Sequence, residues 1–410
     1  MVLAPGAERM SVGSLLRARD REDSSRVGFV ELFFDLVFVF AITQLSHVLL
    51  AHPTPFGALQ TALLLAAVWW VWIYTSWVTN WLDPERVPVQ ACLFALMLAG
   101  LVMSASLPRA FEDRGSAFAI AYVAMQVGRT LFMLWCVRGA SLAMRRNFQR
   151  ILAWMLVSAV FWLTGAQAEG AARFAWWSVA LALEFVAPIL LFRVPGLGRS
   201  STADWDVDGN HMAERCGLFV IIGLGESLLV TGATFAELVW RPDVVAAFVV
   251  AVLGSIAMWW VYFDSGAKRA HHRIAHSNDP GRIARIAYTY LHLPIVAGII
   301  VSAVGDEMVL AHPGHADGPA IAAIIGGPAL YLLGNALFKW VTNDRRLPPL
   351  SHMAGLALLS ALVVPATMHL FGALALATAV LAVLALVAVW EHVSIHRAIP
   401  RPTHAGAPTH

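Results

Sequence analysis

The chain has 410 residues, of which 59% are hydrophobic and only 13% are charged, with a formal net charge of +2. Soluble globular chains have about 45–50% apolar and about 25% charged residues, so this composition excludes a soluble globular protein. The apolar residues come in blocks of roughly 20, which at about 1.5 Å per residue is enough to cross about 30 Å of hydrocarbon. The sequence therefore predicts an all-α, polytopic integral membrane protein.

The apolar blocks predict twelve membrane-spanning helices and both termini in the cytoplasm. Segment 1–27 is charged and has no apolar core before a small-residue cleavage site, which argues against a removable signal peptide. We expect a cytoplasmic segment at 1–27, six helices in 28–193, a cytoplasmic linker at 194–211, six helices in 212–396 and a cytoplasmic tail at 397–410. The expected spans are Gly28–Leu50, Ala58–Trp81, Pro88–Leu107, Ala117–Arg138, Gln149–Ala168, Phe174–Arg193, Met212–Phe235, Val244–Phe263, Ala284–Asp306, Gly318–Trp340, Leu350–Phe371 and Ala373–His396.

The distribution of basic residues supports this count and orientation. Of the 28 Lys and Arg residues, Arg129 falls inside a span, 23 fall on the predicted inner side, and four fall in predicted outer loops, namely Arg109, Arg114, Arg173 and Arg241. Positive charge is retained on the cytoplasmic side of membranes, so the asymmetry predicts an even number of crossings. It also favours anionic lipid as a partner at the cytoplasmic face.

Three pairs of short sequences indicate that the chain repeats itself. AGLVMSA at 99–105 is matched by AGIIVSA at 297–303, WWVW at 69–72 by WWVY at 259–262, and GRTLF at 128–132 by GNALF at 334–338. The pairs occur in the same order and fall in spans two, three and four of each half. Because six spans is an even number, the two halves are expected to share one orientation, as parallel repeats.

Four longer motifs point to a family. The chain contains ELFFDLVFVFAITQL, WWVWIYTSWVTNWLDPER, HMAERCGLFVIIGLGES and YLHLPIVAGIIVSAVG, in that order. Together they resemble the bacterial low-temperature-requirement A (LtrA) family over about residues 28–396. The resemblance implies a multi-pass protein of the bacterial inner (plasma) membrane, in a family named for a growth phenotype. It implies no established reaction or substrate.

Two acids, Glu31 and Asp35, lie one helical turn apart in the first span. Asp35 is about 10 Å into the span from its inner end. A charged group near the centre of a span costs about 2.5–3.5 kcal/mol or more and usually marks a pathway for ions or solutes. We expect Asp35, and the shallower Glu31, to form a proton or cation site; the alternative is a pair near the interface held by a basic neighbour such as Arg26.

The seventh span carries a third acid, Glu226, in the sequence GLGES. In the proposed repeat Glu226 corresponds roughly to Asp35. The adjacent Gly223 and Gly225 either let another helix approach closely or break the helix and free backbone groups for a ligand. Neither alternative explains the acid, so Glu226 is the strongest single candidate for a functional residue.

Arg129 lies near the middle of the fourth span, as the only basic residue expected deep in a span, and its repeat counterpart is Asn335. A buried Arg needs an anion, and the candidates are Asp35, Glu226 and Glu184. We expect Asp35, Arg129 and Glu226 to meet in one cavity. The arginine then either contacts a substrate or forms an ion pair that fixes helix packing.

The segment before the seventh span is rich in acids. Asp204, Asp206 and Asp208 imitate the start of a calcium loop, but Arg215 stands where that loop needs a bidentate Glu. Asp208 is better explained as a helix cap. The next polar residues, His211, Glu214 and Arg215, are expected to form a polar cluster at the cytoplasmic mouth of the site. The less favoured alternative is that this segment binds a metal or a diphosphate.

Two histidine patterns are candidate sites. His272 and His276 have a spacing that suits zinc, but further ligands are not evident and basic neighbours surround them, so a lipid-facing basic segment is favoured. His292, close to Pro294, either relays protons or hydrogen-bonds a backbone carbonyl. No metal site and no nucleic-acid partner are predicted, and the cofactor is left open.

Two classes of function follow from these residues. The first is a secondary transporter or ion-coupled carrier of a small solute, with a central polar site between the halves. The second is an integral-membrane enzyme acting on a lipid or isoprenoid-type substrate, with Asp35 or Glu226 as a general acid. The absence of a nucleophile motif favours the carrier. The substrate, the coupling ion and the oligomeric state are left open.

Overall fold

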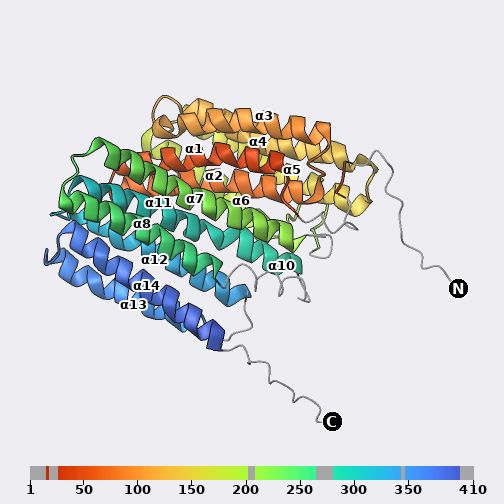
Figure 1. The fold of residues 1–410 in the computed structure, drawn as a ribbon. Coiled ribbons are helices and arrows are strands. Elements are labelled where there is room, and N and C mark those ends of the chain that lie inside the picture. The colour runs from red at the N-terminus through yellow and green to blue at the C-terminus, as the bar shows by residue number, and fades with distance from the viewer. Residues whose placement is uncertain (1–14, 18–25, 202–207, 265–279, 343–346, 398–410) are drawn as a thin grey trace, which may run out of the picture.

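The computed structural model describes residues 15–17, 26–201, 208–264, 280–342 and 347–397. Within these ranges the regular elements are all helices, accompanied by two isolated β-bridges. Twelve helices of the described chain are long and apolar enough to span a membrane. They lie side by side in one bundle (Figure 1). The predicted all-α membrane fold with twelve spans is therefore confirmed.

The long helices follow the chain in two groups of six. The first group is α1 (Phe29–Ala51), α2 (Pro55–Trp81), α3 (Val87–Ser106), α4 (Gly115–Cys136), α5 (Leu142–Gln167) and α6 (Gly170–Ile189). The second group is α7 (Gly209–Glu237), α8 (Pro242–Phe263), α11 (His292–Ala311), α12 (Gly318–Thr342), α13 (Leu350–Thr367) and α14 (Ala373–Arg397). The short helix α10 (Pro280–Ala284) and a π-helical turn, η5 (Arg285–Tyr290), lead into α11.

Local sequence signals set several helix starts. Thr54 caps α2, because its hydroxyl accepts a hydrogen bond from the Gly57 amide, and Ser141 caps α5 in the same way. Proline stands in the first turn of α2, α3 and α8, where its missing amide hydrogen costs nothing.

Two predicted spans, the fifth and the ninth, have ends that differ from the observed helices by more than one turn. The fifth helix begins at Leu142 rather than at Gln149, because Ser141 caps it and the basic first turns are good helix formers. The ninth span was expected to end at Asp306, but α11 continues to Ala311 before Pro313 follows. Asp306 therefore lies inside a membrane-spanning helix. The other boundaries agree within about one helical turn when α10 and η5 are counted with α11, which gives a ninth span of Arg282–Ala311.

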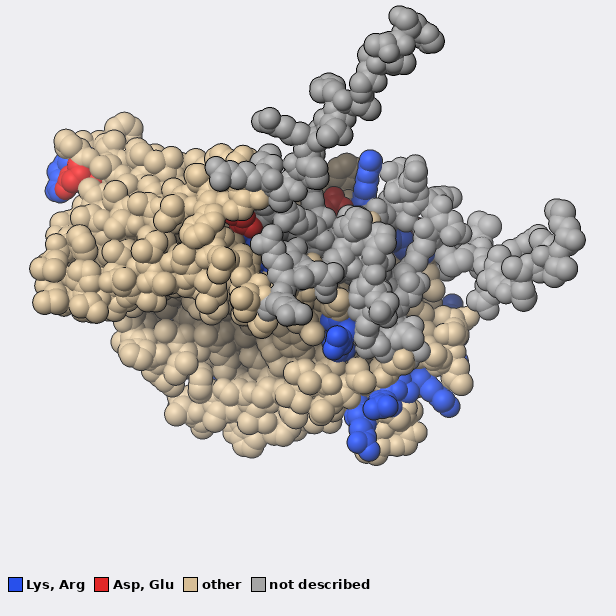
Figure 2. All heavy atoms as spheres, turned by 90° about the horizontal axis from the view of Figure 1, so that it is seen from below, with Lys and Arg blue, Asp and Glu red and all other residues tan. Residues whose placement is uncertain are grey.

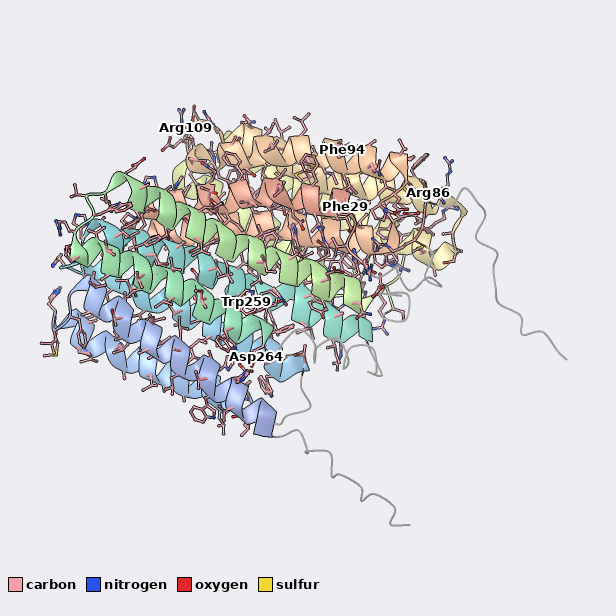
Figure 3. The ribbon with its side chains drawn as sticks, viewed as in Figure 1. Phe29, Arg86, Phe94, Arg109, Trp259 and Asp264 are labelled. Carbon is pink, nitrogen blue, oxygen red and sulfur yellow. The ribbon has the colours of Figure 1, made fainter. Side chains whose placement is uncertain are left out.

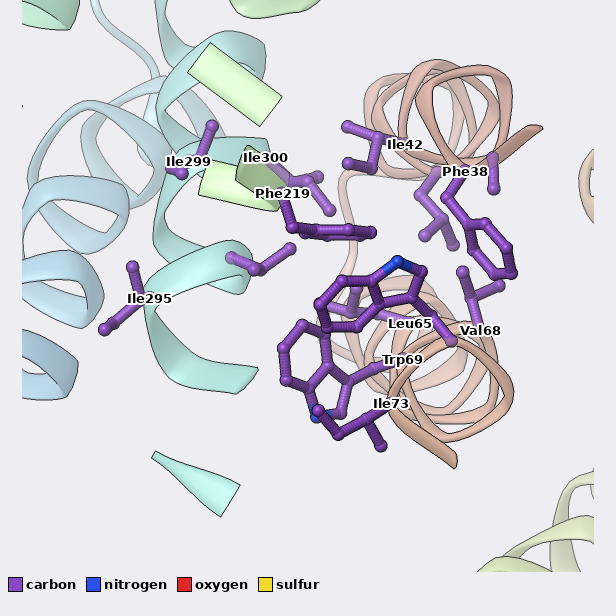
Figure 4. Close-up of a cluster of buried hydrophobic side chains, with 14 of the residues drawn as sticks. Phe38, Ile42, Leu65, Val68, Trp69, Ile73, Phe219, Ile295, Ile299 and Ile300 are labelled. Carbon is purple, nitrogen blue, oxygen red and sulfur yellow. The ribbon is translucent and has the colours of Figure 1, made fainter. Parts of the chain in front are cut away.

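The core between the two groups is aromatic. Phe219 of α7 packs on Trp69 and Trp72 of α2, with ring centroids 5.5 and 4.3 Å apart. Figure 4 shows this contact between α1 and α2 on one side and α11 on the other, where Ile299 and Ile300 close the cluster. The deep tryptophans of α2 are thus packing residues.

The lateral surface of the bundle is apolar. Large side chains such as Phe29, Leu98 and Leu229 are 91%, 68% and 68% exposed, as expected for residues that face lipid. In Figure 2 the visible flank of the bundle is almost free of charge, and most of the Lys and Arg side chains gather toward one end. Arg86 and Arg109, which flank α3, lie at opposite ends of the bundle (Figure 3).

Helices α11 and α12 make the closest backbone contact. A Cβ atom built on Gly298 would lie 2.5 Å from the backbone nitrogen of Tyr331, and one on Gly327 would lie 2.5 Å from that of Ser302. Real Cβ atoms do not approach backbone so closely, so these two glycines allow the helices to touch.

Candidate functional site

Helices α1 and α7 face each other with two pairs, each of an acid on α1 and a basic residue on α7. Glu31 Oε1 lies 2.9 Å from His211 Nε2, and Asp35 Oδ1 lies 2.9 Å from Arg215 Nη2. All four side chains are buried, with 0% exposure. The acids on α1 and the bases on α7 share the same four-residue spacing, so both pairs form at once when the helices run parallel and in register.

The deeper pair, Asp35 and Arg215, is only partly satisfied. Oδ1 of Asp35 also accepts a hydrogen bond of 2.8 Å from Trp72 Nε1, and Arg215 donates to the hydroxyl of Ser76. The guanidinium lies over the Trp72 ring, 5.5 Å from its centroid. Yet Asp35 Oδ2 and Arg215 Nη1 are buried without a hydrogen-bond partner in the described structure. One acceptor and one donor position therefore stay available within a charged, water-poor site.

The shallower pair, Glu31 and His211, is more fully satisfied. Glu31 Oε2 accepts hydrogen bonds from the Gly28 amide and from Arg17, at 2.8 and 3.2 Å. The Asn80 amide donates to His211 Nδ1, which leaves Nε2 to carry the hydrogen that points at Glu31. The basic neighbours of Glu31 are thus Arg17 and His211.

The start of α7 confirms the capping prediction. The Asp208 carboxylate accepts hydrogen bonds from the backbone amides of Asn210 and His211. Glu214, one turn further, accepts a hydrogen bond of 3.2 Å from the Val27 amide. Asp204, Asp206, His272 and His276 lie outside the described residues.

Glu226 of α7 makes a third polar contact with α1, beyond the Glu31–His211 and Asp35–Arg215 pairs. Its carboxylate accepts a short hydrogen bond from the hydroxyl of Thr43, and the side chain is 9% exposed. Helix α7 runs unbroken through Gly223 and Gly225, which excludes the broken-helix alternative. Eleven residues separate Glu226 from Arg215, so the two lie about 16 Å apart along α7.

Arg129 does not join these acids. It donates hydrogen bonds to the Val71 carbonyl and the Thr75 hydroxyl, at 3.1 and 3.0 Å, and a short one to Gln126. Within the described residues, no hydrogen bond or ion pair links Arg129 to Asp35 or to Glu226. The expected meeting of the three is therefore wrong, because Arg129 on α4 points at the backbone of α2.

Other basic residues on the described helices are buried as well. Arg215 is completely buried in α7, and Lys339 of α12 is 1% exposed. Lys339 Nζ lies 2.6 Å from the Val261 carbonyl and 2.7 Å from Glu391. Both residues lie within two turns of a helix end, so the expectation that Arg129 is the only basic residue deep in a span stays a prediction.

Glu184 of α6 joins three helices. Its carboxylate accepts hydrogen bonds from Tyr122 and Gln126 of α4 and from Ser158 and Trp162 of α5, at 2.5 to 2.9 Å. Gln126 connects this cluster to Arg129. Four donors fill the carboxylate, which favours a role in holding α4, α5 and α6 together.

His292 and Asn335 lie in the second group of helices. His292 Nδ1 is 2.8 Å from the Ala287 carbonyl, so Nδ1 donates, and neutral Nε2 can accept from the Tyr262 hydroxyl at 2.8 Å. The histidine thus bonds a carbonyl of the π-helical turn. Asn335 donates to Tyr331 of its own helix, while its Oδ1 is buried without a partner in the described structure.

A groove opens on the flank of the bundle between α3 and α4. Its volume is about 570 Å³ and its walls are mostly apolar, with Cys92, Gly128, Phe132 and Trp135 among them. Arg129, itself 1% exposed, is the one charged side chain in its lining.

Sequence reasoning missed several partners of the candidate residues. These partners are Trp72, Ser76 and Asn80 of α2, and Arg17, which lies in the segment 1–27 expected in the cytoplasm. A usable signal existed for Arg215, because the basic residues His211 and Arg215 repeat the four-residue spacing of the acids Glu31 and Asp35.

Comparisons with known proteins bear on the whole chain. It is 42% identical over 382 residues to the uncharacterized protein RA0937 of Rhizobium meliloti (strain 1021), which covers 92% of this chain and 91% of that protein. No solved structure matches. The model of the bacterial low temperature requirement A protein matches residues 26–389. With twelve apolar helices and a family match over nearly its entire length, this chain belongs to the bacterial LtrA family of membrane proteins.

Proposed function

We propose that this protein is a secondary carrier that couples the movement of a small solute to protons or another ion. The observation that carries the proposal is the buried pair of Asp35 and Arg215 between α1 and α7, with an unpartnered oxygen and an unpartnered nitrogen. Charged groups at membrane depth are costly and usually belong to a pathway.

The pair offers a simple exchange reaction. A proton that binds to Asp35 removes its negative charge and weakens its hold on Arg215. The freed guanidinium, a planar donor, then binds a carboxylate or another anionic group of the solute. When the proton leaves, Asp35 regains Arg215 and displaces the solute. Proton binding and solute binding are thereby coupled.

The other polar contacts support movement between the two groups of helices. Glu31 with His211, and Thr43 with Glu226, lie on either side of the central pair along the same α1–α7 contact. Repeats that rock against each other about such a contact would break and remake these bonds. We further propose that the protein lies in the inner membrane with its inner mouth at Glu31 and His211, and that exposed Arg145 and Arg146 contact anionic lipid there.

Flux measurements in proteoliposomes test the carrier. The purified chain is reconstituted with a pH-sensitive dye inside the vesicles, and amino acids, carboxylates and amines are added one at a time. One class is expected to drive proton movement with wild-type protein, and Asp35→Asn and Glu226→Gln to abolish it while folding persists. If both variants behave like wild type, the acids serve only structure and the proposal fails.

The α3–α4 groove favours a second candidate, an integral-membrane enzyme for a lipid or isoprenoid-type substrate. A hydrocarbon chain lying in this apolar groove would bring an anionic head group toward Arg129. Such an enzyme converts its substrate in detergent without any gradient. Mass spectrometry of a lipid extract incubated with the purified protein, compared with Arg129→Gln, separates this activity from transport.

A further inference from the structure

Asp306 is an acid inside the bilayer that the α1–α7 site does not use. It lies on α11 five residues before Ala311, about 8 Å from the outer end of the helix. Among the described residues, no hydrogen bond or ion pair engages its carboxylate. An acid at this depth needs either a proton or a cation.

The Asp306 side chain, which is partly exposed, lines a partly open cavity between four helices. The cavity has a volume of about 40 Å³ and is bounded by α8, α11, α12 and α14, with Gly254, Gly305 and Ala377 among the small residues in its wall. That space accommodates a single ion, alone or with a water molecule. Its lining contains no Lys, Arg or His, so no basic side chain in the wall balances the carboxylate.

Two residues of the cavity lining carry further oxygens. Ser302, one turn before Asp306, is 6% exposed, and its hydroxyl has no hydrogen-bond partner within the described residues. Pro328 interrupts α12, and because proline has no amide hydrogen, the carbonyl of Ile324 loses its helical donor. Ile324, Pro328 and Ser302 all line the cavity.

We propose that Asp306, Ser302 and the Ile324 carbonyl form a binding site for a small monovalent cation, Na⁺. One carboxylate balances one positive charge, and a hydroxyl and a freed helical carbonyl are oxygen ligands of the kind that hold Na⁺ in membrane proteins. A calcium site would need six to eight oxygens and usually several carboxylates. In the described residues no group of three or more His, Cys, Asp and Glu side chains could hold a metal ion.

This site is independent of the proposed exchange at Asp35. None of the four helices around the cavity carries Asp35 or Arg215, so Na⁺ can bind whether or not the protein is a carrier. A cation here links α11 to α12 at a cavity whose wall α8 and α14 complete. It therefore stabilises the second group of helices, and thermal stability reports its binding directly.

The test is the midpoint of thermal unfolding of the full chain in detergent, followed by tryptophan fluorescence, in NaCl and in choline chloride at equal ionic strength. Wild-type protein is expected to show a saturable rise in Tm with NaCl, and Asp306→Asn to lose it. Ser302→Ala and Pro328→Ala, which remove the hydroxyl and restore the helical donor, are each expected to raise the half-saturating Na⁺ concentration about tenfold.

Glu307→Gln is the matched control, because Glu307 is adjacent on α11 but does not line the cavity. It is expected to keep the full Na⁺ effect. If Asp306→Asn does not fold, binding of radiolabelled sodium to wild type, Ser302→Ala and Pro328→Ala decides the matter. Equal Tm values of the wild type in the two salts, or an Na⁺ effect retained in Asp306→Asn, would overturn the proposal.

Discussion

Asp35 and Arg215 compensate each other's buried charge, so replacing one of them leaves the other uncompensated. Arg215→Met leaves the Asp35 carboxylate buried without its cation, which is expected to lower the free energy of unfolding by about 3–5 kcal/mol. The double variant Asp35→Leu with Arg215→Met removes both charges and is expected to recover most of that loss. Thermal unfolding in detergent measures the difference.

An exposed ion pair provides the control for this cycle. Arg109 and Asp113 are 50% and 56% exposed, so Arg109→Ala is expected to change stability by less than about 1 kcal/mol. The cycle also includes the single variant Asp35→Leu. If the double variant loses as much unfolding free energy as Asp35→Leu and Arg215→Met lose together, Asp35 and Arg215 are not energetically coupled.

At this scale the sequence identified the acids but not their partners. Asp35, Glu31, Glu226 and Arg129 were chosen because charge is rare in membrane spans, and all four are buried. The choice of Arg129 as the partner of Asp35 was wrong, since both lie at membrane depth but on helices that face different neighbours. Depth can be counted along a sequence, whereas the direction in which a side chain points cannot.

At the scale of helices, the contact between α11 and α12 depends on glycine. Gly327→Ala places a Cβ 2.5 Å from the backbone of α11, so the helices must move apart at a cost of about 1–3 kcal/mol. Gly326→Ala is the matched control, because its Cβ would meet nothing within 4 Å. We expect the first variant to lower Tm and the second to leave it unchanged or slightly higher.

Gly326 and Gly327 are consecutive residues of α12 and lie at about the same depth in the bundle. Helix propensity alone would favour alanine at both, so equal Tm values for the two variants would contradict the close contact seen here.

Helix ends are predicted less well from the apolar pattern than the helices themselves. The apolar blocks of the sequence predict most helix ends to within about one turn, because the width of the bilayer sets the length of an apolar helix. The prediction failed at Leu142 and at Ala311, where the helix continues past the apolar block. Capping at Ser141 and tertiary packing of α11, rather than hydropathy, decide those ends.

For the whole molecule, the testable property is orientation. With both termini in the cytoplasm, green fluorescent protein fused to the C-terminus is expected to fluoresce and alkaline phosphatase fused there to be inactive. Alkaline phosphatase inserted after Asp113, in the turn between α3 and α4, is expected to be active.

Active phosphatase at the C-terminus would contradict this orientation and would move the mouth at Glu31 and His211 to the outer face. The parallel halves are tested separately, by a solved structure in which α1–α6 superimpose on α7–α14.

The sequence by itself determined the membrane class, the twelve spans and the family, because these depend on the length, order and composition of apolar blocks. It also determined that Glu31 and Asp35 share one face of α1. Only the tertiary structure decided that Arg215 pairs with Asp35, that the Glu184 carboxylate accepts from four donors, and that Asp306 and Ser302 line a cavity. Partner choice depends on which helices pack together, and that packing is set by small residues and aromatic contacts distributed over the whole chain.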